Sequence, residues 1–286
     1  MVGLVIATLI WGSSFVVIKD TLNSIPPFAL CVLRFVPSAI LLALIYAPKL
    51  RYTKIEDIKK GCITGIFMLG CYIADILAFK YTTASKLAFI TGMNVVFVPF
   101  FAWGINKKRP DKYAIIGVIL ATTGLGLLTI QKGEPIGVGD LLALLSAILI
   151  AVHIIAIERF GKDSDPIVFT VTQFGLTAVG FIILTLIFES FTFTMVMGSL
   201  PQVAYISVFC TLIALLLQVA AQKYLSSTTT AMMLTLSTIF GAAASIYFLN
   251  EFMSAQMVAG GVIIIAAIVT QETKWCFLKD RSSAHK

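Results

Sequence analysis

The chain has 286 residues, of which 59% are hydrophobic and only 12% are charged, and its mean hydropathy is +0.98. A soluble domain carries about 25% charged residues, so this composition excludes a soluble globular protein and a disordered chain, and it indicates a membrane protein with several spans. The formal net charge of +7 would suggest a nucleic-acid partner for a soluble protein, but in a membrane protein it first reports orientation, and we expect no nucleic-acid partner.

Ten apolar runs are predicted to cross the lipid bilayer, since a spanning helix needs about 20 mostly apolar residues. In chain order the predicted spans are 2–18, 27–47, 60–80, 86–105, 112–130, 140–158, 166–188, 202–223, 228–249 and 254–271. The first run lacks a basic n-region and a small-residue cleavage site, so we expect a retained span rather than a signal peptide. The joints are short, and the sequence therefore predicts an all-α integral membrane protein that acts within the bilayer.

The basic residues predict the orientation of the chain in the membrane. An even number of spans puts both termini on one side, and 16 of the 21 Lys and Arg residues lie in loops on that side, against four on the other. Because Lys and Arg are enriched in cytoplasmic loops, we expect both termini in the cytoplasm, a multi-pass protein of the plasma membrane, and a cytoplasmic tail over 273–286.

An internal repeat divides the chain into two halves, over 1–131 and 139–272. Shifting the chain by 139 or by 143 residues superimposes identical residues: Pro27 on Pro166, Val32 on Val171, Phe35 on Phe174, Tyr81 on Tyr224 and Gly117 on Gly260. Five spans in each half invert the second half relative to the first. Inverted repeats are typical of secondary transporters that work by alternating access; an old duplication in a membrane enzyme or channel is the alternative.

Short motifs in a fixed order extend over nearly the whole chain. They are 11–15 (WGSSF), 33–35 (LRF), 81–85 (YTTAS) followed by Pro99, 139–144 (GDLLAL), and 250–251 (NE) before Gly260. In these motifs the chain resembles the EamA family of the drug/metabolite transporter superfamily. The resemblance implies a ten-helix carrier of two inverted five-helix repeats, a central cavity lined by helices 1, 3, 4, 6, 8 and 9, and transport of small metabolites such as amino acids. Two departures are 236–238 (LST), where the family often has Pro, and Lys108, which replaces the acidic counterpart of Glu251.

Three ionisable residues fall inside predicted spans, where their insertion costs about 2.5–3.5 kcal/mol and makes them functional candidates. Arg34 and Asp75 lie at similar depths, so they are predicted to form an ion pair that serves in gating or substrate binding, or that simply locks two helices together. His153 is the repeat mate of Ser14. It is a candidate for proton exchange, with a buried neutral histidine bonded to a carbonyl as the alternative.

Other polar side chains complete the predicted substrate cavity. Asn94 lies near the middle of the fourth span, and Gln218 and Gln222 share one face of the eighth. Amides in such places bind a carboxylate or ammonium group of a solute, or bond one helix to another. Trp11 and Ser14 in the first span are also cavity candidates, although an aromatic residue in a span more often serves in packing.

An enzyme and a channel are the alternatives to a transporter. Residues 137–140 (GVGD) match the GxGD pattern of intramembrane aspartyl proteases, but the only other aspartate well inside a span is Asp75, in a different context, and an N-cap role suffices for Asp140. No zincin or nucleotide-binding motif is present, so we expect neither an enzyme nor a bound metal or cofactor. The sequence predicts a secondary transporter that exports small polar metabolites, with coupling to protons or solute exchange; a passive facilitator is the main rival.

Overall fold

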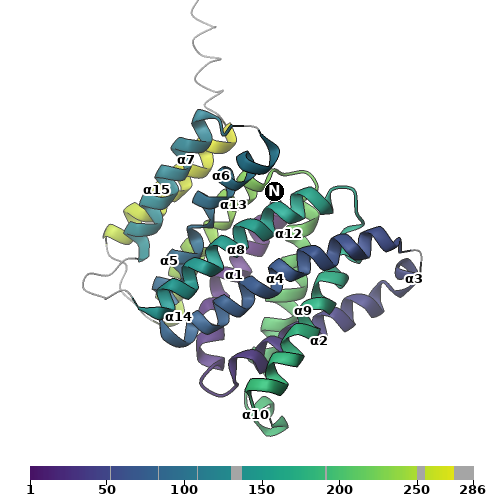
Figure 1. Ribbon diagram of the computed structural model, residues 1–286. Helices are drawn as coiled ribbons and strands as arrows, with labels where there is room; N and C mark the ends of the chain where they lie inside the picture. Colours follow the sequence, from purple (N-terminus) through teal and green to yellow (C-terminus); the bar gives the residue numbers. More distant parts are fainter. Residues whose placement is uncertain are drawn as a thin grey trace, which may run out of the picture.

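The computed structural model describes residues 1–51, 53–82, 84–107, 109–129, 137–190, 192–249 and 255–273. Within these residues every regular element is a helix (Figure 1). The elements are α1 (Val2–Thr21), α2 (Pro27–Ile45), α3 (Ala47–Leu50), α4 (Ile55–Tyr81), α5 (Ala84–Gly92), α6 (Asn94–Asn106), α7 (Lys112–Thr129), α8 (Val138–Gly161), α9 (Pro166–Phe188), α10 (Phe193–Met197), α11 (Leu200–Ala204), η1 (Tyr205–Ile213), α12 (Ala214–Gln222), α13 (Ser227–Leu234), α14 (Leu236–Leu249) and α15 (Ala255–Thr273).

The predicted all-α membrane protein is confirmed, and helix covers most of each predicted span. Seven helical segments among the described residues are long and apolar enough to cross a membrane, and two shorter apolar helices lie at 112–127 and 258–271. The total of ten spans stays a prediction. The predicted tail beyond Thr273 and the motif at 250–251 lie outside the described residues.

Two predicted single spans are broken in the middle. The fourth is divided at Met93 into α5 and α6, and the ninth at Thr235 into α13 and α14. Side chains beside each break bond to backbone carbonyls of the preceding turn, Asn94 Nδ2 to Thr91 O at 2.8 Å and Thr235 Oγ1 to Met232 O at 2.6 Å. Such bonds compete with the regular helical ladder and bend helices. The eighth span is also irregular, because the π-helix η1 lies between α11 and α12.

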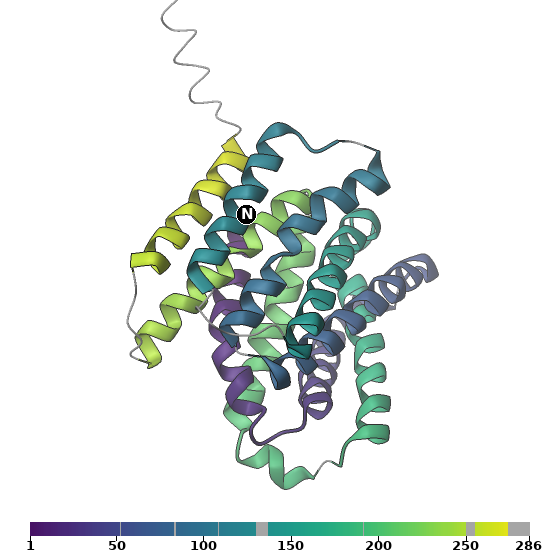
Figure 2. The same ribbon diagram turned by 60° about the vertical axis from the view of Figure 1, so that its left-hand side comes forward.

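The two halves of the chain pack closely against each other. Helix α2 packs against α9, α4 against α8, and α1 against α14, and each of these pairs joins an element of the first half to one of the second. Helices α7 and α15 lie side by side at one edge of the bundle, in both Figure 1 and Figure 2. Each half therefore buries its apolar faces against the other half.

Small residues permit the closest of these helix contacts. A Cβ atom added at Gly12 of α1 would lie 2.6 Å from Ser237 O on α14, and one added at Gly65 of α4 would lie 3.2 Å from the Gln173 Cα on α9. Glycine at a membrane helix interface lets the backbones approach, as in small-xxx-small motifs. The glycines at these crossings therefore set the distance between the two halves.

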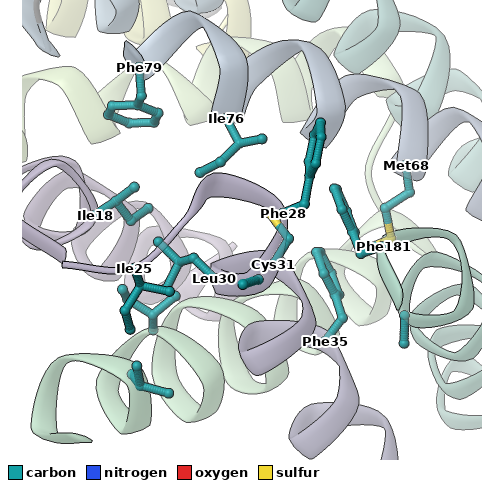
Figure 3. Packing of buried hydrophobic residues seen from close by; sticks show 14 of the residues in the cluster. Ile18, Ile25, Phe28, Leu30, Cys31, Phe35, Met68, Ile76, Phe79 and Phe181 are labelled. Carbon is teal, nitrogen blue, oxygen red and sulfur yellow. The ribbon is translucent and has the colours of Figure 1, made fainter. Parts of the chain in front are cut away.

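Aromatic rings fill the space between α2 and α9. The Phe35 ring of α2 stacks on the Phe181 ring of α9, with centroids 5.9 Å apart and planes only 4° apart, and Phe28 lies 6.3 Å from Phe181 (Figure 3). Phe35 and Phe181 are fully buried. Offset stacked pairs of this kind add about 0.5–1.5 kcal/mol to the stabilisation that comes from burial.

Polar contacts tie the two ends of the α2/α9 pair. At one end the Glu189 carboxylate accepts hydrogen bonds from the backbone N–H groups of Phe28 (2.9 Å) and Ala29 (2.8 Å), at the start of α2. At the other end Lys49 forms an ion pair of 2.6 Å with Asp165, the N-cap residue of α9. Each helix start, which leaves backbone N–H groups unpaired and carries a partial positive charge, is thus satisfied by a carboxylate.

Candidate functional site

A cavity of about 150 Å³ lies where helices of both halves meet. That volume matches an engineered protein cavity that binds benzene. The sequence-predicted residues that line it are Trp11, Ser14, Arg34, Asp75, Asn94, His153 and Gln218. They come from α1, α2, α4, α6, α8 and α12, so residues up to 207 positions apart in the chain converge on one small space.

Arg34 and Asp75 both line the cavity but do not contact each other as predicted. Among the described residues no ion pair within 4.0 Å joins them. The Arg34 guanidinium instead donates from Nε to Thr211 Oγ1 of η1 at 2.6 Å and from Nη2 to the Tyr72 hydroxyl of α4 at 3.3 Å, and its carbon lies 4.5 Å from the centre of the Tyr72 ring. A planar guanidinium favours such stacked and forked contacts.

Asp75 shares the cavity with Ser146 of helix α8. The Ser146 hydroxyl donates to Cys71 O, one turn before Asp75 in α4, at 3.2 Å. The Asp75 side chain is half-buried. A carboxyl group in this position offers the cavity lone pairs and, when ionised, a negative charge.

His153 lies two helical turns from Ser146 on the same helix and is 5% exposed. Its Nε2 atom lies 2.8 Å from Gln173 Oε1 on α9, and Gln173 Nε2 donates to Phe169 O at 3.4 Å. The partner of the buried histidine is therefore a side-chain amide, whereas the alternative considered from the sequence was a backbone carbonyl.

The amide candidates divide into two groups. Asn94 (7% exposed) and Gln218 (3% exposed) line the cavity, but Gln222 does not. Gln222 Nε2 donates to Ile154 O of α8 at 2.9 Å, and its Oε1 accepts from Gln218 Nε2 at 3.1 Å. Gln222 therefore positions Gln218 and does not itself face the cavity.

Trp11 forms part of the cavity wall and joins the two halves. Its Nε1 atom donates to Cys210 O on η1 at 2.8 Å. Ser14, one turn along α1, donates its hydroxyl to Trp11 O at 2.8 Å. A partly buried indole whose N–H is satisfied across the interface holds α1 in a fixed position against the second half.

Sequence reasoning missed several hydroxyl residues of the cavity: Tyr72, Thr91, Ser146, Ser237 and Thr238. Serine and threonine are common in membrane helices and carry little information singly. Helical spacing and the internal repeat could nonetheless have indicated two of them. Ser146 precedes His153 by seven residues, which is the same face of a helix, and Ser237 is the repeat mate of Asn94 at the offset of 143.

The aspartate pair required by an intramembrane protease is not formed by the described residues. Asp140 lies at the start of α8, accepts hydrogen bonds from Thr82 Oγ1 and from Gly137 N, each at 2.8 Å, and does not line the cavity with Asp75. Two aspartates must face each other to share a proton. Asp140 instead completes the N-terminal cap of α8.

The cavity, with polar side chains set among apolar walls, lies between helices of both halves of a membrane protein, and comparison with known proteins identifies the class as a membrane transporter. The sequence model of the EamA-like transporter family matches residues 1–130 and 137–270, once in each half, and the chain belongs to this family. The resemblance stated from the motifs is thereby confirmed.

Two relatives and one solved structure are similar to the chain. An uncharacterized transporter of Archaeoglobus fulgidus is 31% identical over 228 residues, which are 79% of this chain and 70% of that protein. The uncharacterized transporter YetK of Bacillus subtilis is 26% identical over 54% of this chain and 53% of its own length. A solved crystal structure superimposes with a TM-score of 0.79 over 96% of this chain and 97% of its own, at 15% identity, which shows a shared fold.

Proposed function

We propose that the protein is a secondary transporter of the plasma membrane that moves small polar metabolites, such as amino acids or related solutes, by alternating access. The observation that carries the proposal is the cavity at the contact of the two halves, to which the first half contributes charged and amide side chains and the second half a histidine and an amide. Transporters bind their substrates near the bilayer midplane where two repeats meet, often beside broken helices. Here the broken helices α5/α6 and α13/α14 both contribute lining residues.

The size and the lining of the cavity support a small solute. Its volume of about 150 Å³ suits a molecule of roughly benzene size, and its lining combines Arg34 and Asp75 with neutral amides. A zwitterion fits such a mixture of charge and hydrogen-bonding groups. Ten spans in two inverted repeats, with both termini in the cytoplasm and export as the direction, complete the proposal.

Solute counterflow tests the proposal. Purified protein is placed in liposomes loaded with a mixture of unlabelled amino acids, and the uptake of labelled amino acids added outside is measured one at a time. A carrier gives a transient accumulation of at least one labelled solute, because binding on one side drives return from the other. Equilibration without overshoot, for every solute that passes, would establish a passive channel instead.

Asp75→Asn tests the role of the cavity, with Asp20→Asn as a matched control, because Asp20 is exposed near the end of α1 and outside the cavity. We expect the first variant to lose most counterflow and the second to retain it. Normal counterflow by Asp75→Asn, at normal expression, would remove Asp75 from the site. Coupling to protons is tested separately: a proton antiporter responds when the pH gradient is collapsed, whereas a solute exchanger does not.

A further inference from the structure

Three side chains of the cavity are oriented by backbone carbonyl groups, which accept hydrogen bonds and cannot donate them. The first is Asn94. Its Nδ2 donates to Thr91 O at 2.8 Å, which fixes the direction of the amide. The opposite atom, Asn94 Oδ1, is buried and has no hydrogen-bond partner among the described residues. An unpaired buried acceptor is destabilising, so a ligand that donates to it recovers the lost hydrogen-bond energy.

The second is Gln218, which is oriented through Gln222. Since Ile154 O can only accept, the Gln222 amide must turn its Nε2 toward that carbonyl and its Oε1 toward Gln218. Gln218 then donates from Nε2 to Gln222, and its own Oε1 is left without a partner in the described part of the chain. The hydrogen bonds from Gln222 to Ile154 O and from Gln218 to Gln222 thus leave Gln218 Oε1 as an acceptor at the cavity.

The third is His153, which is oriented through Gln173. Phe169 O accepts from Gln173 Nε2, so Gln173 Oε1 must accept from His153 Nε2. In the neutral imidazole a proton on Nε2 leaves Nδ1 as an acceptor, and no described residue bonds to that atom. Asn94 Oδ1, Gln218 Oε1 and His153 Nδ1 together are called the acceptor wall.

Three hydroxyl groups of the cavity also donate to backbone carbonyls. Ser14 donates to Trp11 O at 2.8 Å, Thr91 to Leu87 O at 2.7 Å, and Ser237 to Leu234 O at 2.7 Å. Each of these three hydroxyls uses its only proton in that bond and keeps its lone pairs. The elements that carry the acceptor wall are also packed together, because α6 and α12 both contact α8. The acceptor wall therefore offers the cavity three acceptor atoms, while Asn94 and Gln218 each keep a second amide N–H.

We propose that the acceptor wall binds the primary ammonium group of the transported solute, an inference that rests on the transport function proposed above. A primary ammonium carries three N–H donors and no acceptor, which matches the three acceptors of the wall. The Asp75 carboxyl on the same cavity supplies a negative charge, and the Arg34 guanidinium, which also lines it, directs its hydrogen bonds to Thr211 and Tyr72. A carboxylate or phosphate at the wall would leave all three acceptors without a donor. Gln222 and Gln173 are positioning residues, since they touch the acceptors and not the cavity.

A series of three ligands tests the chemistry on the unmodified, full-length protein in detergent. Benzylammonium has a ring that fits the cavity volume and three N–H donors. Benzyltrimethylammonium keeps the charge but has no donor, and benzyl alcohol keeps a donor but has no charge. Binding is measured by calorimetry and by the shift of the thermal unfolding midpoint. We expect saturable binding of benzylammonium and at least about 10-fold weaker binding of the other two, because each hydrogen bond to a charged group contributes about 1.5–3 kcal/mol. Equal binding of the two cations, or no binding of benzylammonium, would overturn the proposal.

Two variants test the individual acceptors. Asn94→Leu and Gln218→Leu each remove one acceptor and should weaken benzylammonium binding about 10- to 100-fold. Gln256→Leu is the matched control, because Gln256 is exposed on α15, donates to Leu127 O at 3.1 Å and lies outside the cavity. Unchanged affinity in both cavity variants would remove the wall from the site. If a variant fails to fold, the three-ligand series on the unmodified protein still tests whether the cavity binds a primary ammonium group.

The outcomes separate this proposal from the transport function. Benzylammonium binding without counterflow of any solute in liposomes leaves the ammonium site standing and refutes the transporter. Counterflow of a solute that has no amine, with no binding of benzylammonium, keeps the transporter and refutes the site.

Discussion

Substitution of Gly12 by alanine tests the idea that a glycine sets the distance between the halves. A Cβ at this position would lie 2.6 Å from Ser237 O, 2.7 Å from Phe240 Cβ and 2.8 Å from Gly241 N. Two of these atoms are backbone, so neither can turn aside. Contact distances of 3.4 Å or more are ordinary for a Cβ, so α1 and α14 must separate by about 0.8 Å.

The cost follows from overpacking, which is typically about 1–3 kcal/mol. The higher helix propensity of alanine offsets about 0.5–1 kcal/mol of this cost, so Gly12→Ala should destabilise the protein by about 0.5–2 kcal/mol. Gly175→Ala is the matched control, because Gly175 lies inside α9 and a Cβ there meets nothing within 4 Å. We expect a lower thermal unfolding midpoint for the first variant and an equal or higher one for the second.

The measurement is the unfolding midpoint of both variants in the same detergent, followed by counterflow. Gly12→Ala should also reduce transport, because Trp11 and Ser237, on either side of the contact, both line the cavity. A Gly12→Ala variant as stable and as active as the parent would refute the argument that this close approach fixes the two halves.

Three further predictions concern contacts at helix ends and across the interface. Glu189→Ala removes the carboxylate from the start of α2 and should lower stability by about 1 kcal/mol, as loss of a capping group does. Glu189→Gln should have an intermediate stability. Equal thermal unfolding midpoints for the parent and both variants would contradict this prediction. The pKa of Asp165 is lowered, since partial burial, which raises it, is outweighed by the Lys49 ammonium and by backbone N–H donors. The Asp165 carboxylate therefore contributes stability that is present above its unfolded pKa of about 3.9 and is lost as the pH falls through the lower folded pKa. The difference in thermal unfolding midpoint between the parent and Asp165→Asn should therefore shrink below about pH 4. A difference that stays constant with pH would contradict this prediction. Trp11→Phe keeps the ring but removes the 2.8 Å bond to Cys210 O, and a loss of about 0.5–1.5 kcal/mol is expected; an unchanged midpoint would show that this bond does not stabilise the interface.

Composition and apolar run length were sufficient to place the helices along the chain. The breaks at Met93 and Thr235 were not predicted, because no proline or charged residue marks them in the sequence. They depend on side-chain bonds to backbone carbonyls, such as that of Asn94, and these bonds form between residue types that also occur in unbroken helices.

The candidate site could be predicted only in part, because a sequence pattern does not give the direction of a side chain. Rare polar residues in apolar runs, such as Asn94, His153 and Gln218, are conspicuous in the sequence, and the structure brings them to one cavity. Depth in the membrane gave Arg34 and Asp75 the same level, but it does not give the direction in which a side chain leaves its helix. Arg34 points to Thr211, on an irregular segment whose geometry no periodicity reveals.

The two ties at the ends of the α2/α9 pair bear on how the molecule can move. Glu189 holds the start of α2 against α9, and Lys49 of the short helix α3, which follows α2, pairs with Asp165 at the start of α9. With stacked rings between these two contacts, the helix pair resists sliding. The helices interrupted at Met93 and Thr235 have joints instead, and these joints lie beside the cavity. We therefore expect a change of access to bend α5/α6 and α13/α14 around a fixed frame, so that a crosslink between α2 and α9 leaves counterflow intact while a crosslink across either joint stops it.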